Sequence, residues 1–509
     1  MKQSLKLQTL KKNNTMYQPK REFYAKQKEG FELSKDAKNF GLFMEQGTGK
    51  TKVTLDTVSY LYQQGKIDTL IVLAWPNGVH RNWVDNELHQ DLNCPYLAAF
   101  WKSTLDKKLK KQIEKVYCFE NGLRVMTYNI EAMNTKSAIK NIQCFLDSGR
   151  VFFVIDQSAC IKTSKAQRTK SVIKLSTHKN ILYKRILDGD PIAEGLHEIF
   201  MPFKFLDPKI IGLTSYTAFK STYCELGYFK NIIAYKNTDQ LMSKTQPYFF
   251  RCTSDECLDL PDRIYKRWNF DLSQEERRLY DEMSVLGLTT FNTGTEEIIS
   301  REKLAMIKNM RMQQITSGWF NVKTPVFDES IGGHYLKSTL HPIQKHPSRF
   351  LAFQELIKNA KGKILIFSRF TADIKLLEKL LGDEAVSYHG GVSEDKKAEA
   401  KRLFMTDDKI RFFIGQPKTA GIGHTLTAAR HIVFYSNDHS LRLRKECEKR
   451  AHRIGLKHNL IIWDLIAKDT QDNNIVQCLM KKKKICDEIL KEPNNFFLRE
   501  LEDDGSKTL

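Results

Sequence analysis

The stretch GLFMEQGTGKTKVTLDTVSYL, residues 41–61, constrains the fold more than any other part of the chain. An apolar run leads into Gly47-Thr48-Gly49-Lys50-Thr51, and a helical pattern follows at once. Glycines here let backbone N–H groups turn inward around phosphate oxygens, and the N-terminus of the next helix adds positive potential. The sequence therefore predicts a P-loop in an α/β fold. The first glycine of the full pattern is missing, because Met44 occupies its position.

Short apolar runs rich in β-branched and aromatic residues recur along the chain in two groups. Runs that are apolar along their whole length indicate strands buried on both faces, as in parallel sheets covered by helices. One group lies before about residue 190 and the other after about residue 360, which predicts two α/β lobes. The expected strands are 67–74, 123–128, 151–156, 363–368, 410–415, 431–436 and 459–466.

The composition changes between the two groups of strands. Residues 200–260 mix aromatic residues with lysines and turn residues, 272–317 have helical patterns, and 318–348 contain glycines and prolines typical of a loop. We therefore expect a helical insertion between the lobes. The expected segments are a basic arm (1–20), a first lobe with a helical extension at about 200–260 (21–262), an inter-lobe region (263–348), a second lobe (349–490) and an acidic tail (491–509).

The formal net charge is +21 over 509 residues, which favours a polyanionic partner, most simply nucleic acid. Lysine enrichment from an A/T-rich genome is the alternative explanation. No apolar run is as long as a membrane span, so we expect no membrane insertion. The basic start, MKQSLKLQTLKKNNTMY, is not followed by an apolar segment, so we do not interpret it as a secretory signal. Ten scattered cysteines fit a reducing, cytoplasmic compartment. Cys252 and Cys257 are the only close pair, and no second pair accompanies them, so zinc is not expected.

The order of the motifs resembles superfamily 2 helicases of the Swi/Snf-related branch, in particular their compact phage-type members. After GTGKT comes VFFVIDQSAC, residues 151–160, an apolar run that ends in an acid. FYAKQKEGF (23–31), WPNGVHRNWVDNE (75–87) and TYNIEA (127–132) are similar to the Q motif and motifs Ia and Ib. ILIFSRF (364–370), TAGIGHTLTAA (419–429) and EKRAHRIG (448–455) are similar to motifs IV, V and VI.

The resemblance implies two tandem RecA-like P-loop lobes, parallel sheets flanked by helices, that use ATP and Mg²⁺. Gln27 would read adenine, with Phe23 or Tyr24 stacking on it, and Thr51 and Asp156 would hold Mg²⁺. Arg450 and Arg453 are three residues apart, so on a helix they would share a face and reach the γ-phosphate as arginine fingers. The implied catalytic residues are Lys50, Asp156, Gln157, Arg450 and Arg453. The implied ATP-binding residues are Gln27, Gly47, Thr48, Gly49, Lys50, Thr51 and Gly423.

The resemblance also implies a nucleic-acid track that is contacted through its phosphates. Such contacts position a protein without reading sequence. The implied contact residues are Asn77, Thr127, Ser368, Arg369, Thr425 and Thr427. For each residue taken alone, a capping or turn role fits equally well. We expect single-stranded, duplex or branched DNA as the partner and a monomer in the cytoplasm (the host cytoplasm for a phage protein). RNA is less favoured, because no RNA-binding module stands out.

Several motif positions depart from the family's pattern. Gln157 stands where motif II has glutamate, Asp188 and Asp190 replace the hydroxyl residues of motif III, and Glu446 replaces a glutamine of motif VI. Glutamine can hold a water molecule but cannot take its proton. The leading interpretation is an ATP-dependent DNA helicase or translocase that remodels branched or duplex DNA in replication or recombination. The alternative is a nucleotide-responsive DNA clamp with weak or lost hydrolysis. A further hypothesis is that Asp188 or Asp190 supplies the missing carboxylate.

Overall fold

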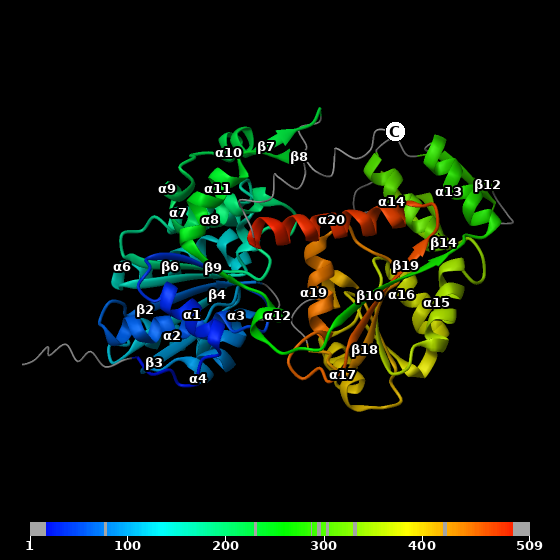
Figure 1. Cartoon of the computed structure of the whole chain (residues 1–509). Helices are drawn as coiled ribbons and strands as arrows, with labels where there is room; N and C mark the ends of the chain where they lie inside the picture. The colour runs from blue at the N-terminus through cyan, green and yellow to red at the C-terminus, as the bar shows by residue number, and fades with distance from the viewer. Residues whose placement is uncertain are drawn as a thin grey trace, which may run out of the picture. The chain divides into compact units, whose positions relative to one another are not determined.

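The computed structural model describes residues 17–75, 79–228, 232–286, 288–292, 297–301, 305–328, 333–420 and 425–491. The chain forms two compact units, one made of Met1–Pro191 and Ile199–Cys257, the other of Ile192–Glu198 and Leu258–Leu509. Each unit is built on one parallel sheet covered by helices (Figure 1). The predicted α/β class with two parallel-sheet lobes is confirmed. Within the described ranges, no helix is long and apolar enough to cross a membrane.

The first unit holds a seven-stranded parallel sheet in the order β3-β4-β2-β5-β6-β1-β9. Its strands are β1 (Asn39–Met44), β2 (Thr69–Ala74), β3 (Tyr96–Phe100), β4 (Leu123–Asn129), β5 (Val151–Asp156), β6 (Ile181–Leu187) and β9 (Phe249–Cys252). Every residue of β2 and β5 is buried, which explains why these segments are apolar throughout. The carboxyl ends of β1 and β5 therefore lie at the same edge of the sheet.

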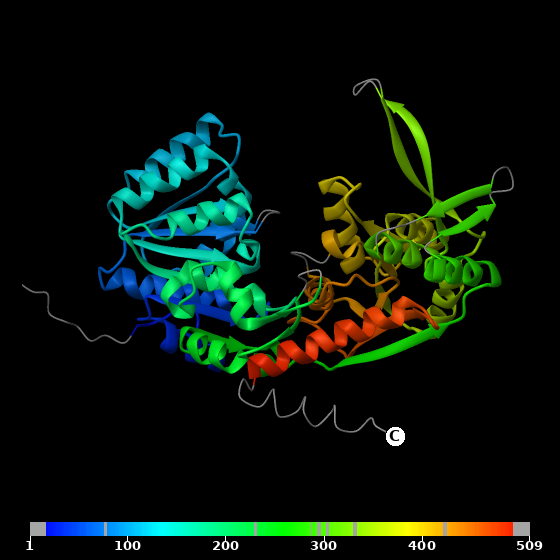
Figure 2. The same cartoon turned by 90° about the horizontal axis from the view of Figure 1, so that it is seen from above.

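Helices cover both faces of this sheet (Figure 2). The longer ones are α1 (Ala25–Ser34), α2 (Lys50–Gln63), α5 (Lys107–Tyr117), α6 (Lys136–Ser148) and α7 (Gln167–Leu175). Short helical segments are α3 (Val79–Asn82), the π-helix η1 (Trp83–Glu87), α4 (Leu88–Asp91), η2 (Ile130–Asn134) and η3 (Ser158–Ile161). The short segment η4 (Leu196–Ile199) lies mostly in the part of the chain that belongs to the second unit. The extension before β9 contains α8 (Phe200–Leu206), α9 (Pro208–Ile211), α10 (Tyr216–Tyr223), the hairpin β7 (Cys224–Leu226) and β8 (Ile232–Tyr235), α11 (Thr238–Thr245) and η5 (Gln246–Tyr248). The short helix α12 (Ser254–Cys257) follows β9.

The second unit holds a six-stranded parallel sheet in the order β10-β19-β18-β15-β17-β16. Its strands are β10 (Arg263–Phe270), β15 (Lys363–Phe367), β16 (Ala385–Tyr388), β17 (Phe412–Gly415), β18 (Ala429–Phe434) and β19 (Leu460–Ala467). Its helices are α15 (Ser348–Asn359), α16 (Thr371–Leu381), η6 (Gly382–Glu384), α17 (Glu394–Thr406), α18 (Pro417–Ala420), α19 (Leu441–Ala451) and α20 (Gln471–Lys491). Residues 263–270, expected in the inter-lobe region, form the edge strand of this sheet.

The insertion between β10 and α15 differs from its prediction in two respects, of which the first is that the stretch 272–317, expected to be helical, contains a strand hairpin at 288–301. It contains α13 (Gln274–Leu286), the hairpin β11 (Leu288–Asn292) and β12 (Glu297–Arg301), and α14 (Ala305–Thr316). The predicted loop at 318–348 is wrong, because β13 (Trp319–Asp328) and β14 (Gly333–Pro342) pair along their whole length as a long hairpin (Figure 2). Pro325 lies inside β13, and a two-stranded ribbon tolerates it because one edge of each strand needs no partner.

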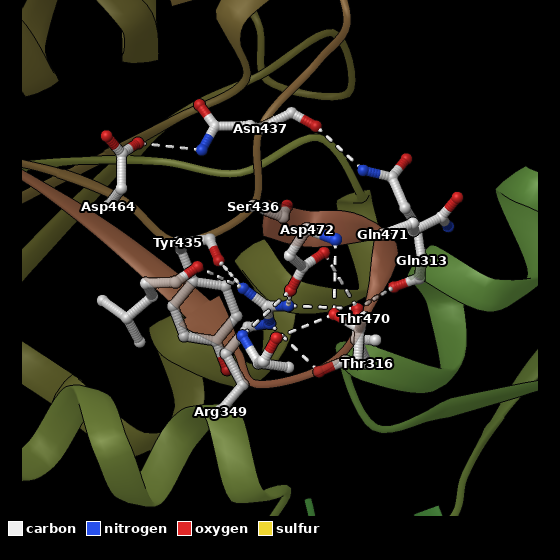
Figure 3. A network of polar contacts seen from close by, with 12 residues as sticks. Gln313, Thr316, Arg349, Tyr435, Ser436, Asn437, Asp464, Thr470, Gln471 and Asp472 are labelled. Carbon is white, nitrogen blue, oxygen red and sulfur yellow. Dashed lines mark hydrogen bonds and ion pairs between the residues drawn. The ribbon is translucent and has the colours of Figure 1, made fainter. Parts of the chain in front are cut away.

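A buried arginine joins the insertion to the second sheet (Figure 3). Arg349 of α15 is 1% exposed, and its Nε donates to the Thr316 carbonyl at 3.1 Å. Its Nη1 donates to the carbonyls of Tyr435 and Leu465 at 2.5 and 3.0 Å, and its Nη2 forms an ion pair with Asp472. One guanidinium therefore holds α14, α15, α20 and the ends of β18 and β19 together.

Candidate nucleotide-binding site

The glycine loop lies between β1 and α2, as the sequence predicts. Gly47 and Gly49 have φ angles of 89° and 94°, in the left-handed region that glycine adopts without strain. A Cβ on Gly49 would lie 2.3 Å from Gln27 Nε2, so a side chain at Gly49 is also excluded by space. Lys50 is the first residue of the 14-residue helix α2. The loop therefore presents backbone N–H groups and a helix N-terminus together, the arrangement that phosphate binding requires.

Gln27 contacts the loop directly from α1. Its side chain is 4% exposed, its Nε2 donates to the Thr48 carbonyl at 3.0 Å, and its Oε1 accepts from the Tyr24 N–H at 3.1 Å. The amide thus braces the phosphate loop. Of the two aromatic candidates, Phe23 stacks on Phe31 at 5.1 Å, whereas Tyr24 is 57% exposed. Tyr24 is therefore the more exposed of the two rings.

Asp156 ends β5 at the same edge of the sheet as the loop. Trp83 Nε1 donates to Asp156 Oδ2 at 2.9 Å and fixes the orientation of this carboxylate. Burial raises the pKa of Asp156, and the nearby Lys50 ammonium opposes that rise. Thr51, the residue after Lys50, lies in the first turn of the same helix. A hydroxyl and a carboxylate beside a phosphate loop are hard oxygen ligands that suit Mg²⁺, so the residues present fit a Mg²⁺–nucleotide complex.

Two carboxylates near Asp156 have roles that the sequence did not identify. Glu87 closes the π-helix η1, accepts from Asn82 Nδ2 at 3.0 Å, and has its pKa raised by burial and then by Asp156. Single π-helical turns occur often at functional sites. The irregular helix η1, which is visible only in the structure, is therefore the feature that points to Glu87. Asp188 is 1% exposed and holds the turn that follows motif II.

The turn after Asp156 is held in an unusual conformation. Gln157 has φ 69°, a left-handed backbone that costs a non-glycine residue about 1 kcal/mol. Asp188 Oδ2 accepts from Ser158 Oγ at 3.0 Å and from the Ala159 N–H at 2.9 Å, and Asp188 Oδ1 accepts from the Asp190 N–H at 3.0 Å. The hypothesis that Asp188 or Asp190 supplies the missing carboxylate stays a prediction, and the structure adds that both Asp188 oxygens accept hydrogen bonds within this turn. Asp190 is only half-buried.

The seven residues after Pro191 belong to the second unit. There Ser440 Oγ donates to Glu194 Oε1 at 2.6 Å, and Lys482 Nζ donates to Glu194 Oε2 at 2.7 Å. Glu194 therefore contacts the N-cap of α19 and the middle of α20. This segment follows Asp188 and Asp190 directly in the sequence. The turn that contains these two residues is therefore covalently linked to the second unit within a few residues.

The arginines of motif VI are placed differently from each other. Arg450 lies in the last turn of α19, is 1% exposed, and donates from Nε to the Glu446 carbonyl at 2.9 Å. Burial lowers the pKa of Arg450 to about 10, and Glu446 opposes that shift. Arg453 donates from Nη1 to Thr425 Oγ1 at 3.0 Å. Since α19 ends at Ala451, the expectation that both arginines share a helix face is wrong.

The six residues expected to contact nucleic acid differ in how they are placed. Thr127 and Ser368 are fully buried, with hydroxyls donating to the His80 carbonyl at 2.7 Å and to Asp373 Oδ2 at 2.6 Å. These two hydroxyls therefore form hydrogen bonds within the fold, which is the kind of structural role that the sequence offered as the alternative to nucleic-acid contact. Arg369 bonds to Gln313 and, through its backbone N–H, to Ser436 Oγ at 2.9 Å. Thr425 and Thr427 are half-buried. Asn77 and Gly423 lie outside the described residues.

Comparison with known proteins covers both units. A sequence model of the SNF2-related domain matches residues 17–324, and one of the helicase conserved C-terminal domain matches residues 348–455. The transcription regulatory protein SNF2 of Saccharomyces cerevisiae is 23% identical over 462 residues, which covers 87% of this chain and 26% of that protein. An uncharacterized ATP-dependent helicase of Mycoplasma genitalium is 23% identical over 459 residues, which covers 89% of this chain and 40% of that protein.

The chain spans only part of these curated relatives, between 26% and 51% of their lengths among the first ones matched. Among solved structures, the Sulfolobus solfataricus SWI2/SNF2 ATPase core in complex with dsDNA is 19% identical. That match covers 96% of this chain and 97% of the other, with a TM-score of 0.39.

Proposed function

The chain belongs to the SNF2-related family, and from this premise we propose that it is an ATP-dependent translocase that moves along DNA and remodels duplex or branched DNA. The observation that carries the proposal is the geometry around the phosphate loop. Lys50 and Asp156 interact electrostatically at the carboxyl edge of a parallel sheet, and Trp83 holds the Asp156 carboxylate in place. The SNF2-related and helicase C-terminal regions follow one another in the family's order.

The chain's own residues account for nucleotide binding. The N–H groups of the glycine loop and the Lys50 ammonium would hold the phosphates, while Thr51 and Asp156 would hold Mg²⁺. Bound ATP with Mg²⁺ supplies the phosphoanhydride whose cleavage releases free energy for motion. Gln27 keeps the loop in register with α1 through its bond to the Thr48 carbonyl. We therefore expect nucleotide affinity to depend on these residues of the first unit.

DNA is the track that the charge supports best. A net charge of +21 supplies non-specific affinity that falls steeply with salt, because each phosphate contact releases a counterion. Backbone contacts of this kind distinguish RNA from DNA only at the 2′-hydroxyl, so RNA stays an alternative track, and we favour DNA because the sequence contains no recognisable RNA-binding module. The proposal includes a role in replication or recombination, which assays with branched DNA substrates would test. We take a monomer as the simplest functional unit.

We expect slow hydrolysis. Gln157 can orient a water molecule but cannot accept its proton, and loss of general-base catalysis costs about 10²–10⁴ in rate. A second candidate function, a nucleotide-responsive DNA clamp, is favoured by one observation. The Asp188 carboxylate, which sequence offered together with Asp190 as a replacement base, accepts hydrogen bonds from Ser158 Oγ and from the N–H groups of Ala159 and Asp190, and these bonds stabilise its ionised form.

The test is ATP turnover with single-stranded, duplex, forked and four-way-junction DNA and with RNA. A translocase releases phosphate faster when DNA is added, and Lys50→Ala abolishes that release. A clamp shows DNA affinity that changes with ATP while no phosphate is released. If ATP neither binds nor alters DNA affinity in the unmodified protein, both functions are excluded.

A further inference from the structure

A buried glutamine of the insertion connects two loops of the second unit. Gln313 lies near the end of α14 and is 2% exposed. Its Oε1 accepts a hydrogen bond from Arg369 Nη1, and its Nε2 donates to the Asn437 carbonyl at 3.1 Å. Figure 3 shows the Gln313 amide directed at the backbone of Asn437. Arg369 follows β15 and Asn437 follows β18, which are neighbouring parallel strands, so this one amide bridges the carboxyl ends of both.

On one side of Gln313 lies a partly exposed arginine. The Arg369 side chain is 26% exposed, and its Nε lies 3.8 Å from Asp438 Oδ2. The Arg369 N–H donates to Ser436 Oγ at 2.9 Å, and the Arg369 carbonyl accepts from Gln416 Nε2 at 3.1 Å. The backbone of Arg369 is therefore fixed, while its guanidinium lies at the surface, where a phosphate of the proposed nucleic-acid track competes with Gln313 for it.

On the other side, Asn437 is joined to α19. Asn437 Nδ2 donates to Asp464 Oδ1 at 2.9 Å, and Asn437 Oδ1 accepts from Arg444 Nη1 at 2.8 Å. Arg444 of α19 forms an ion pair with Asp464 and donates from Nε to Glu448 Oε1 at 2.8 Å. These four side chains are all buried, so their bonds are shielded from water. The same helix continues to Arg450, the expected γ-phosphate contact.

We infer that Gln313 is a positioning residue that couples the Arg369 side chain to α19, so that nucleic-acid binding changes nucleotide affinity and nucleotide binding changes nucleic-acid affinity. The inference deepens the proposed function and rests on it, because that function supplies both ligands. Two arrangements of Arg369 define the coupling, one with its guanidinium on Gln313 and one with its guanidinium on a phosphate. Ligands shift the balance between two such arrangements by binding them with different affinities.

The two arrangements differ in the hydrogen bonds that they leave to Gln313. When a phosphate takes the Arg369 guanidinium, the buried Oε1 of Gln313 loses that donor, which is unfavourable for a buried acceptor. The amide then reorients toward another donor, and its Nε2 leaves the Asn437 carbonyl. Asn437 is thereby freed to shift against Asp464 and Arg444, and α19 shifts with them. Nucleotide contacts at the end of α19 change by the same free energy as nucleic-acid contacts at Arg369.

The test measures the affinity of the full chain for fluorescein-labelled duplex DNA by anisotropy, with and without a non-hydrolysable ATP analogue and Mg²⁺. In the unmodified chain the two affinities should differ at least about fivefold. Gln313→Met keeps the volume but removes both hydrogen bonds, and should abolish most of that difference while each ligand alone still binds. Gln314→Met should keep the difference, because Gln314 is a buried glutamine of the same helix whose Oε1 accepts from Arg311 Nη1 within α14 at 2.8 Å. A purely structural Gln313 would lower stability without changing the ratio of affinities.

A second variant, Gln313→Glu, covers the case in which methionine prevents folding. It keeps an acceptor for Arg369 but removes the donor to Asn437, so the link should again be lost. An unchanged ratio in either Gln313 variant, or a ratio lost equally in Gln314→Met, overturns the inference. Equal DNA affinities with and without nucleotide, in an unmodified chain whose ATP turnover rises with DNA, overturn the inference alone. An unmodified chain that binds no nucleotide contradicts the proposed function as well.

Discussion

Replacing Arg349 by methionine should destabilise the second unit more than any surface change. Methionine keeps much of the length and apolar volume but removes every donor of the guanidinium. The carbonyls of Thr316, Tyr435 and Leu465 would lose their Arg349 donor, and Asp472 would keep a buried charge without its cation. Removing one partner of a buried ion pair costs about 3–5 kcal/mol, because the other charge is left uncompensated.

The free energy of unfolding can be measured by urea titration, with hydrogen exchange of the β18, β19 and α20 peptides assigning the loss to this unit. Arg402→Met is the matched control, since Arg402 pairs with Glu399 on the exposed surface of α17, and we expect no measurable change. Adding Asp472→Asn to Arg349→Met should recover part of the loss by removing the stranded charge. A loss below about 1 kcal/mol in Arg349→Met would refute the reasoning.

Two further predictions concern buried carboxylates. Burial raises the pKa of Asp373 from 3.8 to about 6, so the folded chain binds this proton more tightly than the unfolded chain, and this group's contribution to stability rises as pH falls from about 6 to about 4. Asp373→Asn should flatten that rise, which reaches about 3 kcal/mol, when urea midpoints are compared across this range; equal slopes in both proteins would contradict it. Trp83→Phe should keep the buried ring but remove the donor to Asp156, and should weaken Mg²⁺-dependent nucleotide binding about fivefold by calorimetry. Unchanged affinity would mean that the carboxylate needs no such orientation.

The central strands could be predicted because burial on both faces forces an apolar sequence. All seven expected segments, from 67–74 to 459–466, became strands of the two parallel sheets. The edge strand β10 was missed since most of its side chains are exposed and Lys266, Arg267 and Asn269 interrupt any apolar run. The strand β6 was missed because Lys184 and Arg185 interrupt its apolar run, although Arg185 is fully buried. The hairpin of β13 and β14 was missed because pairing between strands overrode the glycines and prolines.

The candidate site likewise has a part that the sequence predicted and a part that only the structure shows. The glycine loop and the acid at the end of β5 are local patterns, and sequence located both. The brace from Gln27 to Thr48, the bond from Trp83 to Asp156 and the cap that Asp188 provides depend on contacts between distant segments. No spacing rule reveals such contacts. The position of Arg453 beyond the end of α19 depends on where one helix stops, which is the least predictable feature of a helix.

The most direct test of the proposed function is DNA-stimulated ATP turnover in the unmodified chain, in Gln157→Glu and in Lys50→Ala. Lys50→Ala sets the background. We expect slow turnover in the unmodified chain that rises by at least about 10²-fold in Gln157→Glu, since the new carboxylate restores the proton acceptor beside Asp156. Turnover in Gln157→Glu that stays at the unmodified level, with nucleotide still bound, would contradict the claim that Gln157 is what slows an otherwise complete translocase.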